Sequence, residues 1–470
     1  MTASDTRSPG TTLTPRLRLV LVLLLAAQFM LAVDFSILNV ALPVIGDGLG
    51  FSMAHLQWIG TAFALCAAGF TLLFGRVADL FGRRRLFLGG LAVLGAASLL
   101  GGLAQSPELL ITARILQGLA TAAVTPAALS LLTTSFPEGP LREKALGLNG
   151  ALMSAGFTTG AILGGLLTDL LSWRWAFFIN VPVALAVLLA APTVVEESRQ
   201  AERPKLDLPG AVSVTLGLLA IVFGLTRAGE SGWGSPTALL SLTAGVVLLL
   251  VFYGVERSVT APLVPLTVLG KRSVAWGNVA GLIAFLTETS LVFLLTLYLQ
   301  EVLGFSPLAA GLSFGVLGLG TVVGGSVAPM VIGRFGSRPA LIVGGIAQTV
   351  ATATLLGLGD TRTSLWLLLT GTFVGGVGNM LVIVGFMVTA TSGLADHEQG
   401  LATGLATMTQ QIGITMGTPV MSAVATAAMT GSGTAAVLGG LKTAIAVNAA
   451  VVLLGTVTSA VFLRARGAGR

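Results

Sequence analysis

The chain has 470 residues, of which 54% are hydrophobic and 9% are charged, and its mean hydropathy is +0.94. Soluble globular proteins carry about 25% charged residues, so this composition excludes a soluble enzyme or a disordered chain and is typical of a polytopic helical membrane protein. The formal net charge of +6 does not indicate a nucleic acid partner, because the basic residues lie in short loops between apolar segments.

Fourteen apolar runs are long enough to cross a bilayer as helices, which takes about 20 residues. They lie at 17–43, 56–75, 86–104, 107–134, 145–169, 174–193, 208–226, 236–255, 273–301, 307–332, 339–359, 364–393, 400–428 and 438–463. The first run follows two arginines, as a signal peptide would, but it is too long and has no convincing cleavage site. We therefore predict an all-α integral membrane protein with fourteen transmembrane helices.

Basic residues are distributed unequally between the two sets of loops. If both termini are cytoplasmic, 20 of the 25 lysines and arginines lie on the cytoplasmic side and four on the other, while Arg114 falls inside a span. Lysine and arginine concentrate in the cytoplasmic loops of membrane proteins. The split therefore predicts a multi-pass protein of the plasma (inner) membrane with both termini in the cytoplasm.

The two halves of the chain carry a faint internal repeat. Gly82-Arg83-Arg84 after the second span resembles Gly336-Ser337-Arg338 after the tenth, each in a short basic turn. Transporters built from two related halves show such repeats. We therefore predict two six-helix bundles, 17–193 and 273–463. A cytoplasmic linker and two inserted helices (194–272) separate them, and cytoplasmic tails (1–16 and 464–470) flank them.

Three ionisable residues lie inside predicted spans, where a charge costs about 2.5–3.5 kcal/mol on insertion scales. Desolvation disfavours the charged form of Asp34, which suits a group that binds and releases a proton; a hydrated capping carboxylate is the alternative. Arg114 stays protonated and could bias a nearby carboxylate towards ionisation, or merely pack against Gln117. Glu288 could hold a cationic substrate or a second proton, or be a neutral buried acid. All three are predicted proton-coupling residues.

Uncharged polar side chains extend the predicted substrate site. Gln117, Tyr298 and Gln300 join Asp34 and Glu288 as candidates for contact with substrate. No cluster of metal-ligating residues accompanies them.

The cytoplasmic end of the second span carries a candidate gate. It consists of Gly75, Asp79, Gly82, Arg83 and Arg84. A charge cluster at a helix end can stabilise one conformation by binding a partner that moves during transport. The alternative is that these basic residues only fix the orientation of the helix in the membrane, as cytoplasmic lysines and arginines commonly do.

The fifth span carries Gly156, Gly160, Gly164 and Gly165. The spacing of four places the first three on one face of the helix, where another backbone can approach closely. We therefore predict a helix-packing face.

Motifs for enzyme chemistry are weak or missing. Gly311-Leu312-Ser313-Phe314-Gly315 matches a nucleophile elbow, but it lies inside an apolar helix instead of a strand–turn–helix. No phosphate-binding loop exists, so transport must draw on an ion gradient. One cysteine, Cys66, excludes a disulfide framework, and His55 and His397 provide little for a metal site or a triad. We expect no enzyme activity, no metal and no cofactor.

The order and spacing of four motifs resemble the major facilitator superfamily, in its fourteen-span drug–proton antiporter branch. Residues 75–85 (GRVADLFGRRR) resemble the loop that gates the cytoplasmic side, and residues 114–118 (RILQG) resemble the fourth-span motif whose arginine is implicated in proton coupling. Residues 34–43 (DFSILNVALP) and 173–182 (WRWAFFINVP) are similar to two motifs common in that branch.

One position departs from the family pattern. Ala161 stands where the fifth-span antiporter motif has proline, so we expect a straighter helix. The resemblance implies a monomeric, proton-coupled exporter of amphipathic organic compounds such as drugs or antibiotics, acting on a small molecule and protons within membrane lipid.

Other functions remain open from the sequence. The low aromatic content of 6% also fits an exporter dedicated to one metabolite or antibiotic. A proton symporter for uptake would use the same fold. The few intramembrane polar groups argue against a channel, and the lack of a soluble domain argues against a sensor.

Overall fold

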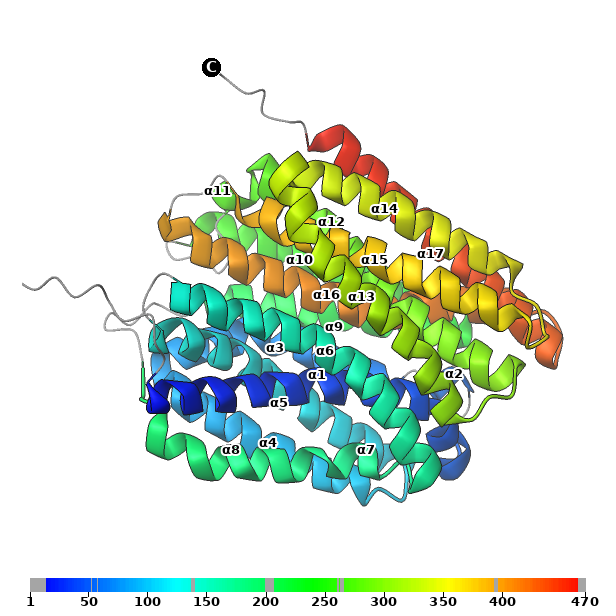
Figure 1. Ribbon diagram of the computed structural model, residues 1–470, viewed down its shortest axis with the longest axis horizontal. Helices are drawn as coiled ribbons and strands as arrows, with labels where there is room; N and C mark the ends of the chain where they lie inside the picture. The colour runs from blue at the N-terminus through cyan, green and yellow to red at the C-terminus, as the bar shows by residue number, and fades with distance from the viewer. Residues whose placement is uncertain are drawn as a thin grey trace, which may run out of the picture.

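The computed structural model describes residues 14–51, 53–56, 58–136, 140–198, 207–259, 262, 266–392 and 396–463. Its long helices run roughly parallel to one axis in two groups, with a hairpin between them in the chain (Figure 1). The N-terminal group contains α1 (Pro15–Leu49), α2 (Met53–Leu56), α3 (Trp58–Phe81), α4 (Arg83–Gly102), α5 (Pro107–Ser135), α6 (Pro140–Leu170), α7 (Trp175–Phe178) and α8 (Asn180–Val194).

The hairpin and the C-terminal group follow. The hairpin consists of α9 (Leu208–Ser231) and α10 (Pro236–Ser258), and α11 (Leu266–Leu269) follows it. The C-terminal group contains α12 (Arg272–Leu297), the π-helical turn η1 (Tyr298–Val302), α13 (Pro307–Phe335), α14 (Ser337–Thr354), the 3₁₀ turn η2 (Leu355–Gly357), α15 (Ser364–Thr391), α16 (Asp396–Ala428) and α17 (Thr434–Phe462).

Each of the fourteen predicted spans coincides with a helix of the structure. Within the described residues, eleven helices are long and apolar enough to cross a membrane. The other three predicted spans fall on α3, α6 and α16, which have 24, 31 and 33 residues. The sixth predicted span is interrupted, because α7 ends at Phe178 and α8 begins at Asn180. The predicted all-helical membrane fold is confirmed.

Several helices start with the same local sequence, a serine or threonine followed by proline. Thr14-Pro15, Ser106-Pro107, Ser235-Pro236 and Ser306-Pro307 open α1, α5, α10 and α13. In each, the hydroxyl accepts a hydrogen bond from a first-turn backbone N–H, as in Leu109 N to Ser106 Oγ at 3.3 Å. Proline fits the first helical position because it lacks a backbone N–H.

The two groups share one packing pattern. Counting α7 and α8 as one span, the first helix packs against the fifth, the second against the fourth, and the third against the fourth and the sixth. In the N-terminal group these pairs are α1–α6, α3–α5, α4–α5 and α4–α8, and in the C-terminal group they are α12–α16, α13–α15, α14–α15 and α14–α17. The faint repeat in the sequence therefore corresponds to a structural repeat.

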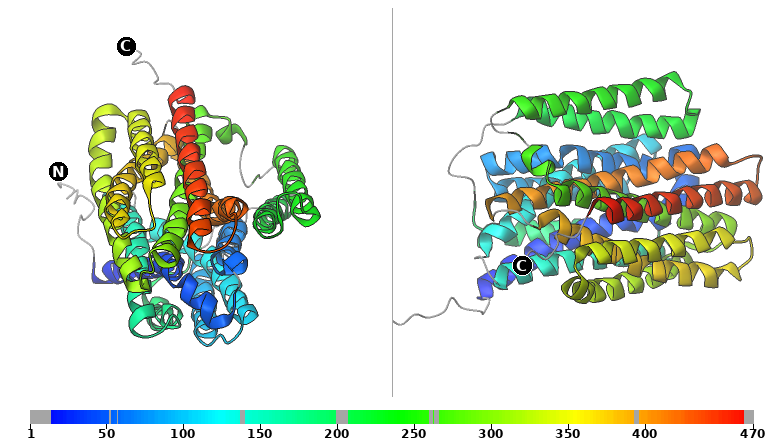
Figure 2. Two further views of the ribbon diagram at one scale, coloured as in Figure 1. Left: turned by 90° about the vertical axis from the view of Figure 1, so that its right-hand side faces the viewer. Right: turned by 90° about the horizontal axis from the view of Figure 1, so that it is seen from above.

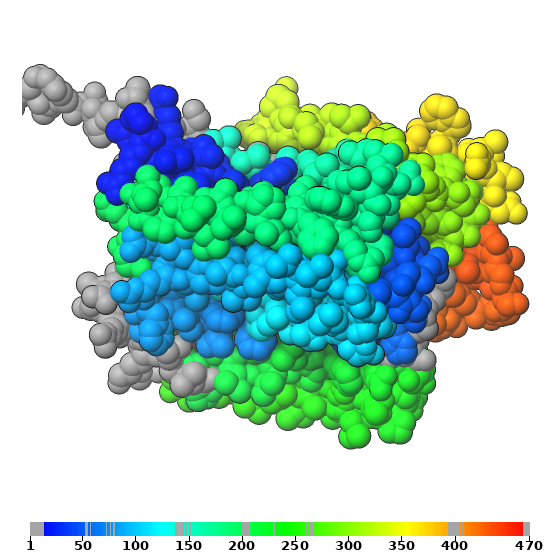
Figure 3. Space-filling view, turned by 90° about the horizontal axis from the view of Figure 1, so that it is seen from below, coloured from blue at the N-terminus to red at the C-terminus, as the bar shows by residue number. Residues whose placement is uncertain are grey.

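The α9–α10 hairpin lies beside the two groups. Figure 2 shows it as a separate green pair, and in Figure 3 it forms one edge of the face built by α8 and α4. Helix α9 packs against α3 of one group and α16 of the other, whereas α10 packs mainly against α9. Thr215 Oγ1 of α9 donates a 2.5 Å hydrogen bond to the Gly69 carbonyl of α3. The hairpin therefore spans the seam between the groups on one side.

The apolar core is shared at one end of the molecule and divided at the other. Where α1 ends and α13 begins, one cluster joins residues of both groups, including Ile37, Ile45, Leu295 and Phe314. At the opposite end, where α1 begins, the two groups have separate clusters, one around Phe87 and Leu131 and one around Phe285 and Phe386. A smaller cluster of α9, α11, α12 and α16 at this end also contacts Leu73 of α3. The two groups therefore share more apolar packing at the first end than at the second.

Candidate functional site

A buried carboxylate lies near the middle of α1. The Asp34 side chain is 0% exposed, and its two oxygens accept hydrogen bonds from three donors. Arg114 Nη1 lies 3.1 Å from Oδ2, and Gln117 Nε2 lies 3.0 Å from Oδ1. Asn180 Nδ2 also donates to Oδ1. The donors come from α5 and α8, so this carboxylate joins three helices of the N-terminal group.

Arg114 binds several groups of the same cluster through Nε and Nη1. It is 1% exposed and forms an ion pair with Asp34. Its Nε donates to the Ile59 carbonyl at 3.0 Å, and Nη1 also donates to Gln117 Oε1 at 2.8 Å. The guanidinium lies over the Phe63 ring, 4.1 Å from its centroid, which adds a cation–π contact. The structure thus brings together the acid, the arginine and the glutamine that the sequence identified separately.

Two members of this cluster were missed by the sequence analysis. Ser98 of α4 accepts hydrogen bonds from Gln117 Nε2 at 2.8 Å and from Asn180 Nδ2 at 3.3 Å. Asn180 follows the helix break at residue 179 and is 0% exposed. The family-like motif at 173–182 contains Asn180, so the motif could have indicated it, whereas Ser98 has no distinguishing pattern.

The cluster holds a buried ion pair whose hydrogen bonds depend on the ionised form of Asp34. The ion pair is neutral overall, and a buried pair of this kind is tolerated because its hydrogen-bonding groups are largely satisfied. A proton on Asp34 would cancel its charge, remove an acceptor from the three donors and leave the Arg114 charge without its partner. Proton binding therefore requires the donors from α5 and α8 to rearrange.

A cavity between the two helix groups adjoins this cluster. Its lining comes from α1, α3 and α5 on one side and from α12 and α16 on the other, and includes Asn39, Thr61, Arg114, Thr289 and Thr415. The hydroxyl of Thr61 is buried and has no hydrogen-bond partner among the described residues. The cavity therefore offers free polar groups beside the arginine.

The other sequence candidates are not part of the cluster. Glu288 is partly exposed and has no hydrogen bond or ion pair within the part of the chain that the structure describes. Tyr298 Oη donates to the Gly359 carbonyl at 2.6 Å, and Gln300 Nε2 donates across the seam to the Val40 carbonyl at 2.7 Å. Neither Tyr298 nor Gln300 lines the central cavity.

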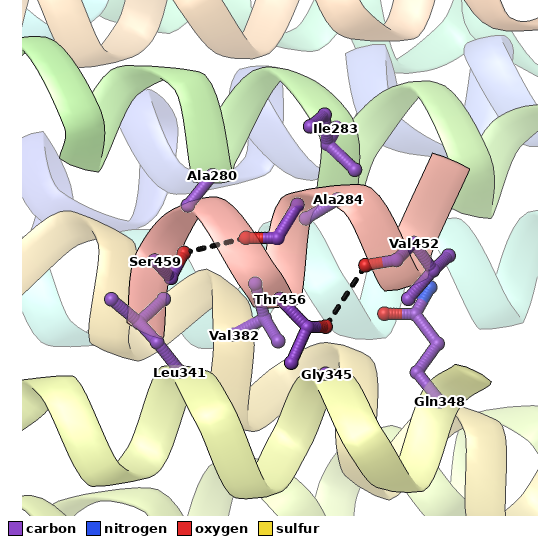
Figure 4. Close-up of a pocket in the computed structure, with 11 residues that line it drawn as sticks. Ala280, Ile283, Ala284, Leu341, Gly345, Gln348, Val382, Val452, Thr456 and Ser459 are labelled. Carbon is purple, nitrogen blue, oxygen red and sulfur yellow. Dashed lines mark hydrogen bonds between the residues drawn. The ribbon is translucent and has the colours of Figure 1, made fainter. Parts of the chain in front are cut away.

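A second cavity lies within the C-terminal group, between α12, α14, α15 and α17. Figure 4 shows Gln348 at one end of it, and Thr456 and Ser459 bonded back to their own helix. Small side chains such as Ala280 and Ala284 form much of its wall. It carries no charged group among the described residues, so we interpret it as a packing gap.

The predicted gate is tied to its own helix group. The backbone N–H groups of Arg84 and Arg85 donate to the Glu197 carboxylate at 3.0 and 3.2 Å, at the N-terminus of α4. Gly82 has φ +113° and faces this carboxylate. Glu197, which follows α8, was missed by the sequence analysis. The helix α3 runs through Gly75 and Asp79, but the Asp79 side chain lies outside the described residues.

The glycines of α6 are placed against two different helices. A Cβ on Gly156, Gly160 or Gly164 would lie 3.0 Å or less from atoms of α1, whereas one on Gly165 would meet the Pro307 carbonyl of α13. The backbone carbonyl of Ala161 contacts Gly311 of α13. Helix α6 is continuous through Ala161. It packs tightly against α1 on one face and against the other group on the next.

Two similar groups of helices long enough to span a membrane, with a buried ion pair within one of them, are typical of a secondary transporter. The chain belongs to the Major Facilitator Superfamily, whose family profile matches residues 24–418. It is therefore a multi-pass membrane transporter and not an enzyme.

Related proteins and solved structures agree with this assignment. The puromycin resistance protein pur8 of Streptomyces alboniger is 40% identical over 87% of this chain and 82% of its own length. The cephamycin export protein CmcT of Amycolatopsis lactamdurans is 40% identical over 88% of this chain and 85% of its own length. The lincomycin resistance protein of Streptomyces lincolnensis is 35% identical over 84% of this chain and 81% of its own length. The nucleoside transporter NupG has the same fold, with a TM-score of 0.63 and 12% identity, covering 95% of this chain and 100% of NupG.

Proposed function

We propose that this protein is a proton-coupled exporter of small amphipathic organic molecules such as antibiotics and that it works by alternating access. The observation that carries the proposal is the Asp34 carboxylate, fully buried and held by Arg114, Gln117 and Asn180. The names of the related resistance and export proteins support antibiotics as the substrate class.

The packing provides a route from the proton site to the seam between the groups. Asp34 lies on α1, and α1 packs closely against α6 through the Ile37 carbonyl at Gly164. The next glycine of α6, Gly165, contacts Pro307 of α13 in the other group. A rearrangement of α1 on protonation would therefore be transmitted through α6 to the contact between the halves.

The divided core supports an inward-open state. We propose the topology indicated by the basic residues, with both termini cytoplasmic, two bundles at 17–193 and 273–463, and a monomeric transporter. The large shared apolar cluster then closes the outer side, and the separate clusters lie on the cytoplasmic side, together with the smaller cluster that Leu73 of α3 contacts. Transport would require the outer contacts to open and the cytoplasmic ends to close.

The proton gradient supplies enough energy for useful export. Each elementary charge that moves inward gains about 2.3 kcal/mol per 100 mV. This corresponds to roughly fifty-fold accumulation per net charge. One proton per cycle therefore supports export of an uncharged substrate against a roughly fifty-fold gradient at 100 mV.

Transport into proteoliposomes tests this proposal directly. We expect an imposed pH gradient to drive accumulation of at least one compound from a panel of puromycin, lincomycin, ethidium and chloramphenicol. Asp34→Asn should abolish this accumulation, because the exchangeable proton is lost. Removal of one partner from a buried ion pair costs about 3–5 kcal/mol, so the double variant Asp34→Asn/Arg114→Gln keeps the test independent of folding.

The matched control is Asp169→Asn, which changes an exposed acid at the end of α6 and should transport normally. Full pH-driven accumulation by both Asp34 variants would refute the coupling role. Accumulation only with the opposite gradient direction would identify an uptake symporter.

A further inference from the structure

The α9–α10 hairpin lies outside the internal repeat, and its two helices have different surroundings. Half of the apolar part of α9 is buried, against 11% of that of α10. Ala211, Val214 and Val222 of α9 are 3% exposed or less, whereas Leu240 and Leu250 of α10 are 70% and 64% exposed. Helix α10 packs mainly on α9, on the side away from the two groups (Figure 2). The contact between the hairpin and the transporter is therefore made by α9.

Helix α9 is attached to α3 at two levels. Near the middle, the buried Thr215 hydroxyl donates to the Gly69 carbonyl, and a Cβ on Gly69 would lie 3.5 Å from the Thr215 methyl group. At the first turn of α3, the Trp58 ring lies 6.0 Å from the Phe223 ring, measured between centroids. Hydrogen bonds and aromatic pairs have preferred geometries. These contacts therefore hold α9 and α3 in one register.

The described contact between α9 and α16 is apolar. Ala211 shares a buried cluster with Leu405 of α16, and Met408 of α16 and Leu73 of α3 pack against this cluster. Apolar contacts have no preferred direction, so α16 can shift along α9 without the loss of a hydrogen bond. Helix α9 therefore lies in the seam between α3 and α16 at the end where the two groups otherwise have separate cores.

We propose that the hairpin is a lateral seal that moves with the N-terminal group. Helix α16 slides along α9 during transport, and α9 keeps lipid out of the α3–α16 seam in both conformations. This inference rests on the proposed alternating access, in which the cytoplasmic ends of α3 and α16 move apart and together. On the other side of the molecule the groups meet directly, because the Gly165 and Gly311 backbones of α6 and α13 are in close contact. The α3–α16 seam is therefore the one that the hairpin covers.

Reversible crosslinks test which group carries the hairpin. The background is Cys66→Ala, which has no other cysteine. Gly69→Cys/Thr215→Cys joins α9 to α3. Ala211→Cys/Leu405→Cys joins α9 to α16. A short bis-methanethiosulfonate reagent closes each pair and reduction reopens it, so each variant is compared with itself. We expect the α3 crosslink to leave pH-driven accumulation within twofold of the reduced protein and the α16 crosslink to lower it at least tenfold.

Quenching by brominated lipid tests the seal without any transport measurement. A bimane label on Leu73→Cys reports lipid in the seam, in the same Cys66→Ala background. The matched control is Val246→Cys on α10, because Val246 is 50% exposed on the outer helix of the hairpin. We expect brominated acyl chains to quench the control label at least fivefold more strongly than the seam label, with and without a pH gradient.

The other outcomes contradict the inference. Normal transport by the α16-crosslinked protein would show that α9 and α16 do not slide. Loss of transport with the α3 crosslink alone would place the hairpin on the C-terminal group, and loss with both would make it move relative to both groups. Equal quenching of the two labels would reject the seal. Absence of pH-driven transport by the wild type, with the difference in quenching intact, would instead reject the export function.

Discussion

At the scale of single residues, the Asp34–Arg114 pair depends on neutral neighbours. A buried ion pair is stable only when the remaining polar groups around it are satisfied. Gln117 and Asn180 each donate to the carboxylate, and both also donate to Ser98. The neutral residues therefore hold the charged pair in one arrangement, which a proton can then change.

The first prediction at this scale concerns Asn180. Asn180→Ala removes donors to Asp34 and Ser98, and an unsatisfied buried group costs about 1–3 kcal/mol. We expect a lower thermal unfolding midpoint of the purified protein in detergent. Asn149→Ala is the matched control, because among the described residues the buried Asn149 amide donates only to the Met153 sulfur, at 3.9 Å. Equal unfolding midpoints for the two variants would show that Asn180 does not stabilise the cluster.

At the scale of helices, α6 lies between α1, which carries Asp34, and α13 of the other half of the molecule. Its glycines allow the α1 backbone to approach on one face and α13 on the next. Spacing in the sequence predicted this packing face, because glycines four apart share one side of a helix. The identity of the neighbours could not be predicted, since it depends on how distant helices meet.

The prediction for this element is made at Gly164. A Cβ there would lie 2.1 Å from the Ile37 carbonyl oxygen, a backbone atom that cannot turn aside. Gly164→Ala should therefore separate α1 from α6. We expect this variant to lose about 1–3 kcal/mol of stability and to show reduced pH-driven transport. The control is Gly89→Ala on α4, where the added Cβ would have no other residue's atom within 4 Å, so this variant should behave like the wild type. Normal thermal stability and transport in Gly164→Ala would argue against the tight α1–α6 contact.

At the scale of the whole molecule, composition and loop charges were sufficient to predict the helical membrane fold and its fourteen spans. Ionisable residues inside spans are rare, so Asp34 and Arg114 could be identified from the amino-acid sequence alone. Ser98 could not, because neutral polar residues are frequent in such helices and its partners, Gln117 and Asn180, come from distant segments. The π-helical turn η1 (Tyr298–Val302) also has no local signal in the sequence.

The central claim is that export is coupled to the Asp34 proton, which requires that binding of substrate and binding of this proton exclude one another. Purified protein in weak buffer with a pH indicator tests it when ethidium is added, since this cation cannot itself gain or lose a proton. We predict that the wild type releases protons in proportion to bound ethidium, while Asp34→Asn/Arg114→Gln binds ethidium without release. Equal proton release by that double variant and the wild type would contradict the account.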